Sequence, residues 1–382
     1  MTAAGRQEWL DGVGEFARSR VAPAAAAWSL GASPGPEENA EAGRLGLFGI
    51  ELPSEHGGGS YGFAGKAAAC EILAAADFGF AMSVVNTHNV ALRLSLSAAD
   101  RIRERYLPDL LAGRKSACTA LTEPGAGSDL AALATTAERS GDGWILNGEK
   151  SWIINGRHPG LCIVFAQTDR AAGLAGLGAF LVDLDGDGVR RHAIESGFSQ
   201  TSIGTGGFVL TDTAVADDAM ILPPGKAFRA IIEEINGARV YVAAMCCGML
   251  KAGIATAAAY GARREVFGRK LEDHQAWRAV LAEAETDLAA ARALTAEATG
   301  LVDRGEDARL AAAQAKIAAV ETGQRHLPAL LHAMGAEGLR PEHCLARHLG
   351  ALQTAALADG ANALLKQQVA KLSRQTTTTT EA

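Results

Sequence analysis

The sequence predicts an α+β protein with an N-terminal helical domain, a middle β-barrel-like domain and a C-terminal four-helix bundle. The main observation is that the hydrophobic period is helical at first, changes to short β runs between turns, and then becomes helical again. The chain also has 382 residues, of which 48% are apolar, enough to bury a large core. We expect domains at residues 1–117, 118–225 and 226–374, and a disordered tail at 375–382.

The N-terminal domain shows helical spacing from its first residues. Leu10, Val13 and Phe16 fall on one face of a helix because they are three residues apart. A Gly-rich segment at 55–60 interrupts this pattern, and Ala- and Leu-rich helices follow it. Alanine has a high helix propensity and a small side chain, so these helices can approach one another closely.

The middle domain is predicted from short β runs with turn residues between them. The clearest pair is Trp144–Leu146 and Trp152–Ile154, which flank Asn147-Gly148. Asn-Gly favours the positive φ angles of a tight turn, so we expect a hairpin there. Further strands are expected at 161–165, 179–184 and 208–211.

Long helices with few breaks are predicted in the C-terminal domain, and they are typical of a bundle. The apolar run from Val240 to Leu250 lies between charged residues and is shorter than a membrane span, so we interpret it as a core helix. The vicinal Cys246 and Cys247 in this run are expected to pack in the core. The four expected helices are 226–260, 276–304, 308–334 and 345–372.

Charge and cysteine content exclude several function classes. The chain has 36 basic and 43 acidic side chains, a net charge of −7, and no run of Lys or Arg, so no nucleic acid and no membrane are expected as partners. The six cysteines include no C-x-x-C, and no His pair has zinc-ligand spacing, so no metal site is expected. Buried thiols and the absence of an apolar signal core at the start favour a cytoplasmic protein.

The segment most able to carry chemistry is residues 122–129, Thr-Glu-Pro-Gly-Ala-Gly-Ser-Asp. The proline and the glycines can hold turns in which successive N–H groups point at one anion, with the hydroxyls of Thr122 and Ser128 beside them. A pyrophosphate would suit such a loop. Taken alone, the same Gly-x-Gly pattern is more often an ordinary surface loop.

Two further motifs follow in order. Residues 152–156 are Trp-Ile-Ile-Asn-Gly, and residues 264–268 are Arg-Glu-Val-Phe-Gly, with Gln275 after them. With residues 122–129, these motifs resemble the T-E-P-x-A-G-S-D, W-I-x-N-G and R-x-x-F-G…Q patterns of the acyl-CoA dehydrogenase family. The resemblance covers nearly the whole chain, which is identified as a divergent member of that family.

The resemblance implies bound FAD and a dimer-of-dimers tetramer, with a homodimer as the other possibility. By position, Leu121 and Thr122 would contact the isoalloxazine edge, Ser128 the pyrophosphate, and Trp152 the flat face of the ring. The physics agrees, since an indole suits a flat apolar ring and a guanidinium suits a pyrophosphate. The residues implied to reach the FAD of a neighbouring subunit are Arg264, Phe267 and Gln275.

The implied reaction is α,β-dehydrogenation of an acyl thioester, on CoA or a carrier protein, with an electron-transfer flavoprotein or similar acceptor as partner. A carboxylate removes the α proton, and the β hydrogen leaves as hydride to flavin N5. Counting from Gly335, the family's base position falls on Asp359, one methylene shorter than the usual Glu. Arg239 and Ser128 are the implied substrate-binding residues, and Arg239 is placed at the start of the apolar helix.

Several positions around the implied flavin site depart from the family pattern. Ile154 replaces a hydroxyl residue near N5, so a side-chain donor is lost there. His332 and Ala361 replace the usual Gln and Thr of the C-terminal turn and of the base segment. The resemblance implies that these two residues, Ile154 and Gly335 also contact FAD. Because of these changes, two alternatives stay open: a flavin-dependent monooxygenase on the same fold, and a flavin-binding protein without turnover.

Overall fold

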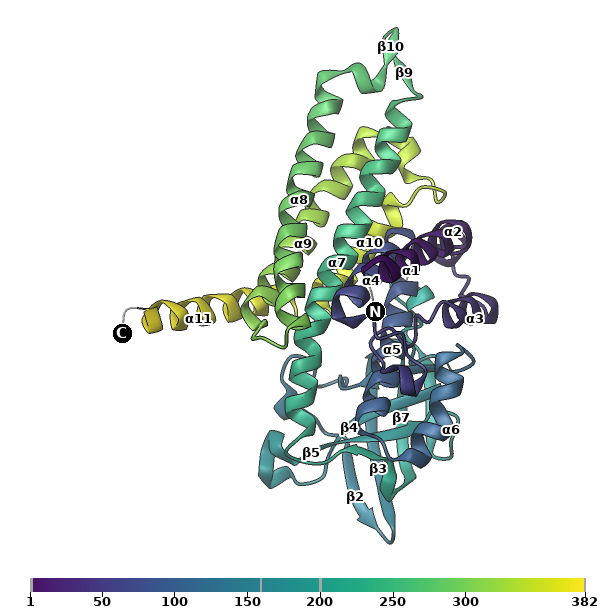
Figure 1. The fold of residues 1–382 in the computed structure, drawn as a ribbon, viewed down its shortest axis with the longest axis vertical. Helices are drawn as coiled ribbons and strands as arrows, with labels where there is room; N and C mark the ends of the chain where they lie inside the picture. The colour runs from purple at the N-terminus through teal and green to yellow at the C-terminus, as the bar shows by residue number, and fades with distance from the viewer. Residues whose placement is uncertain (1–2, 159, 199–200, 381–382) are drawn as a thin grey trace.

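The computed structural model describes residues 3–158, 160–198 and 201–380. Helices come first, a sheet follows, and long helices complete the chain, so the three-part α+β prediction is confirmed (Figure 1). The N-terminal helices are α1 (Ala3–Phe16), α2 (Ala22–Ser29), α3 (Pro36–Arg44), α4 (Gly62–Ala76), α5 (Phe78–Ser97) and α6 (Asp100–Leu111).

The strands of the middle region form one mixed sheet in the order β6-β7-β3-β2-β4-β5-β8, and β1 pairs with β4 in parallel. β4 is buried at every position, as expected for a strand covered on both faces. The strands are β1 (Ser116–Ala120), β2 (Thr136–Ser140), β3 (Gly143–Ile153), β4 (Gly160–Gln167), β5 (Leu177–Asp183), β6 (Val189–Ala193), β7 (Gly206–Ala216) and β8 (Met220–Leu222).

The prediction of a hairpin at Asn147-Gly148 is wrong. These two residues lie inside β3, where the register against β7 shifts between Leu146 and Gly148. Gly148 has φ 150°, and a Cβ atom there would lie 2.5 Å from Thr135 Oγ1, so glycine is needed for a bulge rather than for a turn. The hairpin lies earlier in the chain, between β2 and β3. There Ser140 pairs with Gly143, and Gly141 has a positive φ.

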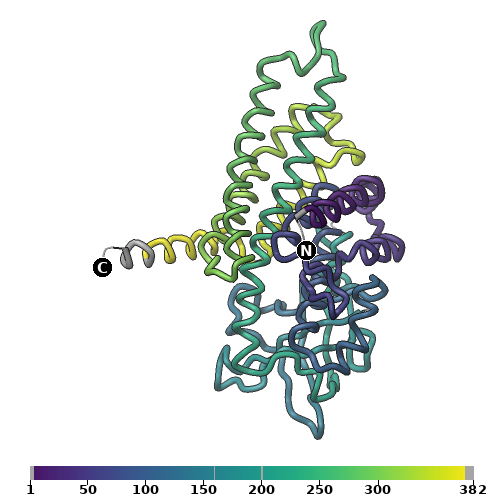
Figure 2. The backbone as a smooth tube through the Cα atoms, viewed as in Figure 1, coloured from purple at the N-terminus to yellow at the C-terminus, as the bar shows by residue number. Residues whose placement is uncertain are grey.

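The C-terminal region is built on α7 (Ala227–Gly261), which runs from the sheet to the far end of the molecule (Figure 2). A short hairpin, β9 (Glu265–Val266) and β10 (Arg269–Lys270), joins α7 to α8 at that end. The other helices are α8 (Gln275–Asp303), α9 (Arg309–Ala333), α10 (Leu345–Leu357) and α11 (Asn362–Thr380).

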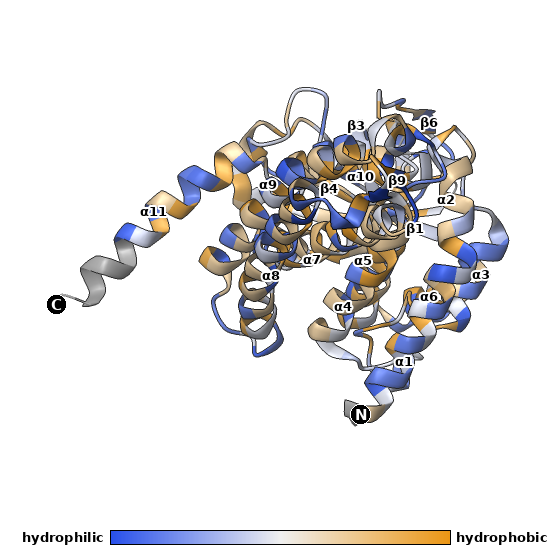
Figure 3. Cartoon of the chain, turned by 90° about the horizontal axis from the view of Figure 1, so that it is seen from above, coloured by the Kyte–Doolittle hydropathy of each residue, from blue (hydrophilic) through white to orange (hydrophobic). Residues whose placement is uncertain are grey.

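Two expectations for the C-terminal region need correction. The helix expected at 345–372 is divided into α10 and α11 by a break at residues 358–361. Residues 375–380, expected in a disordered tail, continue α11, which projects away from the rest of the molecule (Figures 1 and 3), while residues 381–382 lie outside the described residues.

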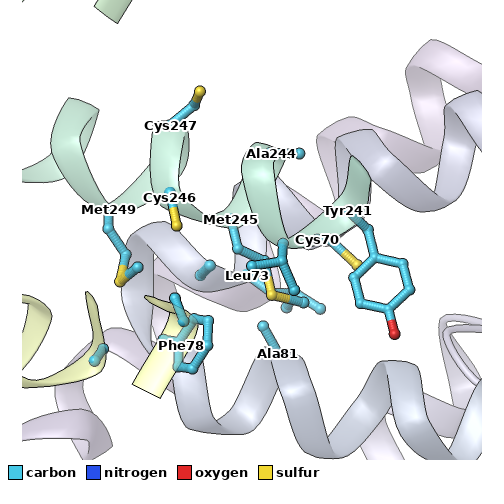
Figure 4. Close-up of a cluster of buried hydrophobic side chains, with 14 of the residues drawn as sticks. Cys70, Leu73, Phe78, Ala81, Tyr241, Ala244, Met245, Cys246, Cys247 and Met249 are labelled. Atoms are coloured by element: carbon cyan, nitrogen blue, oxygen red, sulfur yellow. The ribbon is translucent and has the colours of Figure 1, made fainter. Parts of the chain in front are cut away.

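Helix α7 forms the centre of the largest hydrophobic core, with α4 and α5 against it. Figure 4 shows Met245 and Cys246 of α7 directed toward Leu73 and Phe78, whereas Cys247 points away from them. Both cysteines are buried, which confirms that they pack in the core. By length and composition, α7 is the one helix of the described chain able to cross a membrane, because the whole helix is longer than its Val240–Leu250 run. Its most apolar window is 67% buried inside the protein, as in the core helix that the sequence predicts.

We predict that Gly248→Ala destabilises the protein. A Cβ atom at Gly248 would lie 2.1 Å from the carbonyl oxygen of Glu71, so α4 and α7 would have to separate. Overpacking of this kind costs about 1–3 kcal/mol, which should lower the midpoint of thermal unfolding. Gly300→Ala on α8 is the matched control, because its Cβ would meet only the flexible end of Arg304. That variant should be neutral or slightly more stable, and an equal loss in both variants would contradict the prediction.

Candidate active site

The segment predicted to bind a cofactor leaves the sheet at the end of β1. Glu123 and Ala126 exchange two backbone hydrogen bonds of 2.8 and 3.1 Å, which close a tight turn over Pro124 and Gly125. Leu121 and Thr122 are half-buried before this turn, and Ser128 is exposed after it. The hydroxyls and the backbone of the loop are therefore open to a ligand along one side.

A buried ion pair fixes this loop to the sheet. Lys150 on β3 is fully buried, and its Nζ donates to Glu123 Oε1 at 2.8 Å and to the Leu121 carbonyl at 3.0 Å. Glu123 also accepts the N–H groups of Ala134 and Thr135 at 2.6 and 3.0 Å. Burial raises the pKa of Glu123, but Lys150 and these donors hold that pKa below its usual value, so the carboxylate stays ionised.

Trp152 lies beside the loop, at the end of β3. The N–H of Ser151 donates to the Thr122 carbonyl at 3.0 Å, which places the end of β3 next to the loop. Trp152 has φ 60° and is 60% exposed, so a large aromatic face is held outward by unusual backbone. Ile154, two residues on, is half-buried against the main core and brings no polar group to this side.

Asn155 holds the segment after Trp152 against two other elements. Its Nδ2 donates to the carbonyls of Ser83 on α5 and Ala117 on β1 at 3.0 and 2.9 Å. Its Oδ1 accepts the Ser83 hydroxyl at 2.6 Å. The Asn of the W-I-x-N-G segment therefore orients the indole through the backbone, and it is buried away from any ligand.

These residues fit a flavin. An exposed indole offers a flat apolar surface, and the hydroxyls of Thr122 and Ser128 with the open backbone at Gly125 suit the polar edge and phosphates. The Gly125 backbone has no heavy atom within 4 Å of the place a Cβ would take, so the loop leaves space for a group to approach. Leu121 and Phe228 of α7 pack into the same small cluster, which closes the apolar side of the loop.

Asp359, the predicted base, lies in the break between α10 and α11. Ala358 is extended, and Asp359 and Gly360 have φ 52° and 102°. A left-handed aspartate is unusual and costs about 1 kcal/mol, so neighbouring groups must hold it. The positive φ angles of Asp359 and Gly360 are not those of a right-handed helix, so the helix expected at 345–372 is interrupted here. Ala361, the residue after this turn, is half-buried where α11 begins.

Two cations from different helices adjoin the Asp359 turn. Arg239 lies in the interior of α7 rather than at a helix start, and its Nε donates to the Asp359 carbonyl at 3.0 Å. Lys316 on α9 is fully buried, and its Nζ donates to the carbonyls of Ala356 and Gly360 at 3.2 and 2.8 Å. The turn is therefore held from both sides by positive groups.

These surroundings set the acidity of Asp359. Burial raises the pKa of Asp359 to about 6, while the charges of Lys316 and Arg239 oppose that rise. Burial lowers the pKa of Lys316 to about 8, and the Asp359 charge opposes that change. Asp359 is therefore ionised at neutral pH but more basic than an exposed aspartate.

Asp359 and the loop at residues 121–129, called here the flavin loop, are connected through α7. Phe228 of α7 packs with Leu121, and Arg239 lies eleven residues farther along the same helix. At 1.5 Å per residue this is about 16 Å of helix, a distance that a cofactor and a thioester could fill together. Substrate-binding roles for Arg239 and Ser128 remain predictions.

The remaining predicted cofactor residues lie away from the loop in this chain. Arg264, Phe267 and Gln275 gather at the β9–β10 tip, at the opposite end of the molecule from most of the sheet (Figure 1). All three are exposed, and Phe267 is 95% exposed. His332 and Gly335 are also exposed, at the end of α9. None of these five residues touches the flavin loop within the described chain.

Comparison with known proteins identifies the family of this chain. Three family models match consecutive parts of the chain: acyl-CoA dehydrogenase N-terminal domain at residues 4–114, middle domain at 118–213 and C-terminal domain at 225–373. The chain belongs to the acyl-CoA dehydrogenase family. It is an oxidoreductase of the type that acts on CH–CH groups, and a flavoprotein.

Individual acyl-CoA dehydrogenases and relatives match over most of their length. The mitochondrial short-chain specific acyl-CoA dehydrogenase of Homo sapiens is 31% identical over 308 residues, 80% of this chain and 74% of the relative. Subunit CarC of the caffeyl-CoA reductase-Etf complex of Acetobacterium woodii is 30% identical over 73% of this chain and 74% of its own. A glutaryl-CoA dehydrogenase of Mycobacterium smegmatis in complex with FADH2 has a TM-score of 0.90 and 26% identity, covering 97% of this chain and 95% of that one.

Two buried lysines of the candidate site, Lys150 and Lys316, were not predicted from the sequence. Lys150 sits in a strand whose inward and outward positions are interrupted by the Gly148 bulge, so its burial could not be read from alternation. Lys316 left a usable signal, because it lies on the apolar face of α9 with Ala312, Ala319 and Val320 at helical spacing. A single cation on the apolar face of a helix indicates that a buried polar group lies opposite it, here the carbonyls of Ala356 and Gly360.

We predict that Lys150→Met weakens both the fold and cofactor retention. The change leaves Glu123 buried without its cation, and breaking a buried pair in this way costs about 3–5 kcal/mol. Thermal unfolding and the flavin absorbance per protein should both fall. The double variant Glu123→Gln/Lys150→Met should recover part of the stability, because no uncompensated charge remains; purely additive losses would contradict the coupling.

Proposed function

We propose that this protein catalyses FAD-dependent α,β-dehydrogenation of an acyl thioester, with Asp359 as the base that removes the α proton. The observation that supports this most is a carboxylate on a left-handed turn, held by Arg239, at the position the family uses for its base. Its pKa of about 6 suits a general base at neutral pH, since it is ionised yet still accepts a proton.

The roles of the other residues follow from their positions. Leu121, Thr122 and Ser128 line the side of the loop that would hold FAD, and Trp152 would cover the ring. When bound, FAD supplies the hydride acceptor. Ile154 leaves the neighbourhood of N5 without a side-chain donor, so backbone N–H groups of the 121–122 segment would serve there. His332, Gly335 and Ala361 are proposed at the edge of a cofactor site completed by another subunit.

We propose a homotetramer, or at least a homodimer, in which Arg264, Phe267 and Gln275 reach the FAD of a neighbour. This is supported by the exposure of Arg264, Phe267 and Gln275 at the β9–β10 tip, where all three side chains are accessible to a neighbouring subunit. Exposed Leu357, the last residue of α10, and Leu364, in the first turn of the projecting α11, favour the same interpretation. The assembled protein is expected in the cytoplasm.

The substrate is proposed to be an acyl-CoA, and the electron acceptor an electron-transfer flavoprotein. The name of the human relative refers to short acyl chains, and the name of the Acetobacterium woodii relative refers to a complex with Etf. The monooxygenase alternative, suggested by Ile154, is not favoured, because the relatives named above are dehydrogenases and a reductase and because the base position keeps a carboxylate.

Substitution of Asp359 by Asn should abolish reduction of the flavin by substrate. The amide cannot accept the α proton, while the loop and Trp152 that would hold FAD are untouched. The test is the visible spectrum during anaerobic addition of acyl-CoAs of increasing chain length. The unsubstituted protein should bleach with at least one of them, and Asp359→Asn should keep its oxidised flavin band. Bleaching by the variant at an unchanged rate would refute the role of Asp359.

The rate of flavin reduction should rise with pH through about 6 and level off above about 7. The base works only when ionised, and the raised pKa of Asp359 places that ionisation near pH 6. Below that value the rate should fall about tenfold per pH unit. Stopped-flow reduction between pH 5 and 8 measures this, and a flat profile would exclude Asp359 as the titrating base.

A further inference from the structure

We infer that Lys316 is a positioning residue for the reaction: its buried ammonium holds the turn that carries Asp359 and supplies part of the positive field on that carboxylate. This inference deepens the proposed function and rests on it, since it concerns how the proposed base is held.

The contacts of Lys316 span the base in sequence. Its Nζ donates to the carbonyl of Ala356 at 3.2 Å and to that of Gly360 at 2.8 Å, three residues before Asp359 and one after it. Ala356 belongs to the last turn of α10, whose final carbonyls have no partner within the helix. One side chain from α9 therefore ends α10 and fixes the break before α11.

The opposite side of the turn is held by Arg239, which donates to the carbonyl of Asp359 itself at 3.0 Å. The two cations thus bind two consecutive carbonyls, those of Asp359 and Gly360. Asp359 has φ 52°, a left-handed conformation that is uncommon for residues other than glycine, so the hydrogen bonds from both cations help to hold this backbone in place.

Packing alone does not explain an ammonium at this position. The Lys316 side chain is fully buried, and the described structure records no contact ion pair for it, only the two carbonyls. A methionine would fill a similar space without the desolvation penalty of a buried cation, which amounts to several kcal/mol. The retained charge is therefore best explained by its effect on the nearby Asp359.

The charged and titratable groups that act on Asp359 and Lys316 come from two helices. Lys316 lies on α9, and Arg239, Tyr241 and Cys246 lie on α7. Tyr241 and Cys246 stay neutral, because burial raises the pKa of the tyrosine well above its usual value and that of the thiol as well. If Lys316 loses its charge, Arg239 is the one remaining cation of this group, and protonated Asp359 is favoured up to higher pH.

Lys316→Met tests the inference through the pH profile of flavin reduction. The acid limb of the profile, where the rate rises with pH, should move to higher pH. At pH 6 the rate of flavin reduction should be at least about fivefold lower than in the unsubstituted protein, and at pH 9 the decrease should be smaller. Lys316→Arg keeps a charge and donors and should restore most of the acid limb. A merely structural role would lower the rate equally at both pH values.

Hydrogen exchange gives a second readout that needs no substrate. In Lys316→Met, amides of residues 356–362 should exchange faster, while those of the β1–β4 pairing should not change. Lys366→Met is the matched control, because Lys366 binds Glu321 at 2.7 Å on the surface of the same pair of helices, α9 and α11, and makes no recorded contact with the turn. That variant should keep both the pH profile and the exchange pattern.

The outcomes separate the two proposals. A folded, FAD-containing Lys316→Met with an unchanged acid limb and unchanged exchange at 356–362 overturns the inference. If that variant does not fold, Lys316→Gln is measured in the same way, because its amide NH2 can still donate hydrogen bonds but carries no charge. The acid limb of its pH profile must then be shifted to higher pH. If no acyl thioester reduces the unsubstituted protein, the proposed function fails, and the exchange experiment still decides whether Lys316 holds the turn.

Discussion

The site depends on the placement of one helix, α7, between the sheet and the C-terminal bundle. Its first turns pack Phe228 against Leu121 of the flavin loop, and its middle carries Arg239 to the turn that holds Asp359, the proposed base. Small residues let it approach α4 closely, as at Gly248, where there is no room even for a methyl group. The distance between loop and base is therefore set by a rigid helix and by close backbone contact, which surface loops could not provide.

Two buried lysines have similar roles at opposite ends of this arrangement. Lys150 binds the Leu121 carbonyl and Glu123 in the sheet, and Lys316 binds the Ala356 and Gly360 carbonyls in the bundle. In both places an ammonium holds backbone where a regular element ends, at the end of β1 and at the break between α10 and α11. Irregular segments expose unpaired carbonyls, and a charged donor inside the protein satisfies them strongly. Each of these buried charges therefore lies where the backbone of the candidate site has an irregular conformation.

The order of the helical and β regions and most helices could be predicted from the sequence, because the hydrophobic period reports them directly, whereas the role of Asp359 stays a prediction from the motif. What failed depended on tertiary contacts. Asn147-Gly148 has the chemistry of a turn, yet the Thr135 backbone crowding Gly148 makes it a bulge within β3. The break at 358–361 has no proline and only one glycine, Gly360, and is maintained by Arg239 and Lys316 from other helices. Local sequence carries no sign of such remote partners.

The Asn155 side chain joins α5, β1 and the segment that presents Trp152. A molecule that binds the indole must therefore select the state in which the N-terminal helices are docked on the sheet. By linkage, its binding free energy is added to the stability of that docking, and the docked helices in turn raise the affinity of the indole surface. Dissociation of the bound molecule and undocking of the N-terminal helices are then coupled equilibria. A change in α5 can therefore alter the affinity of the Trp152 surface for that molecule.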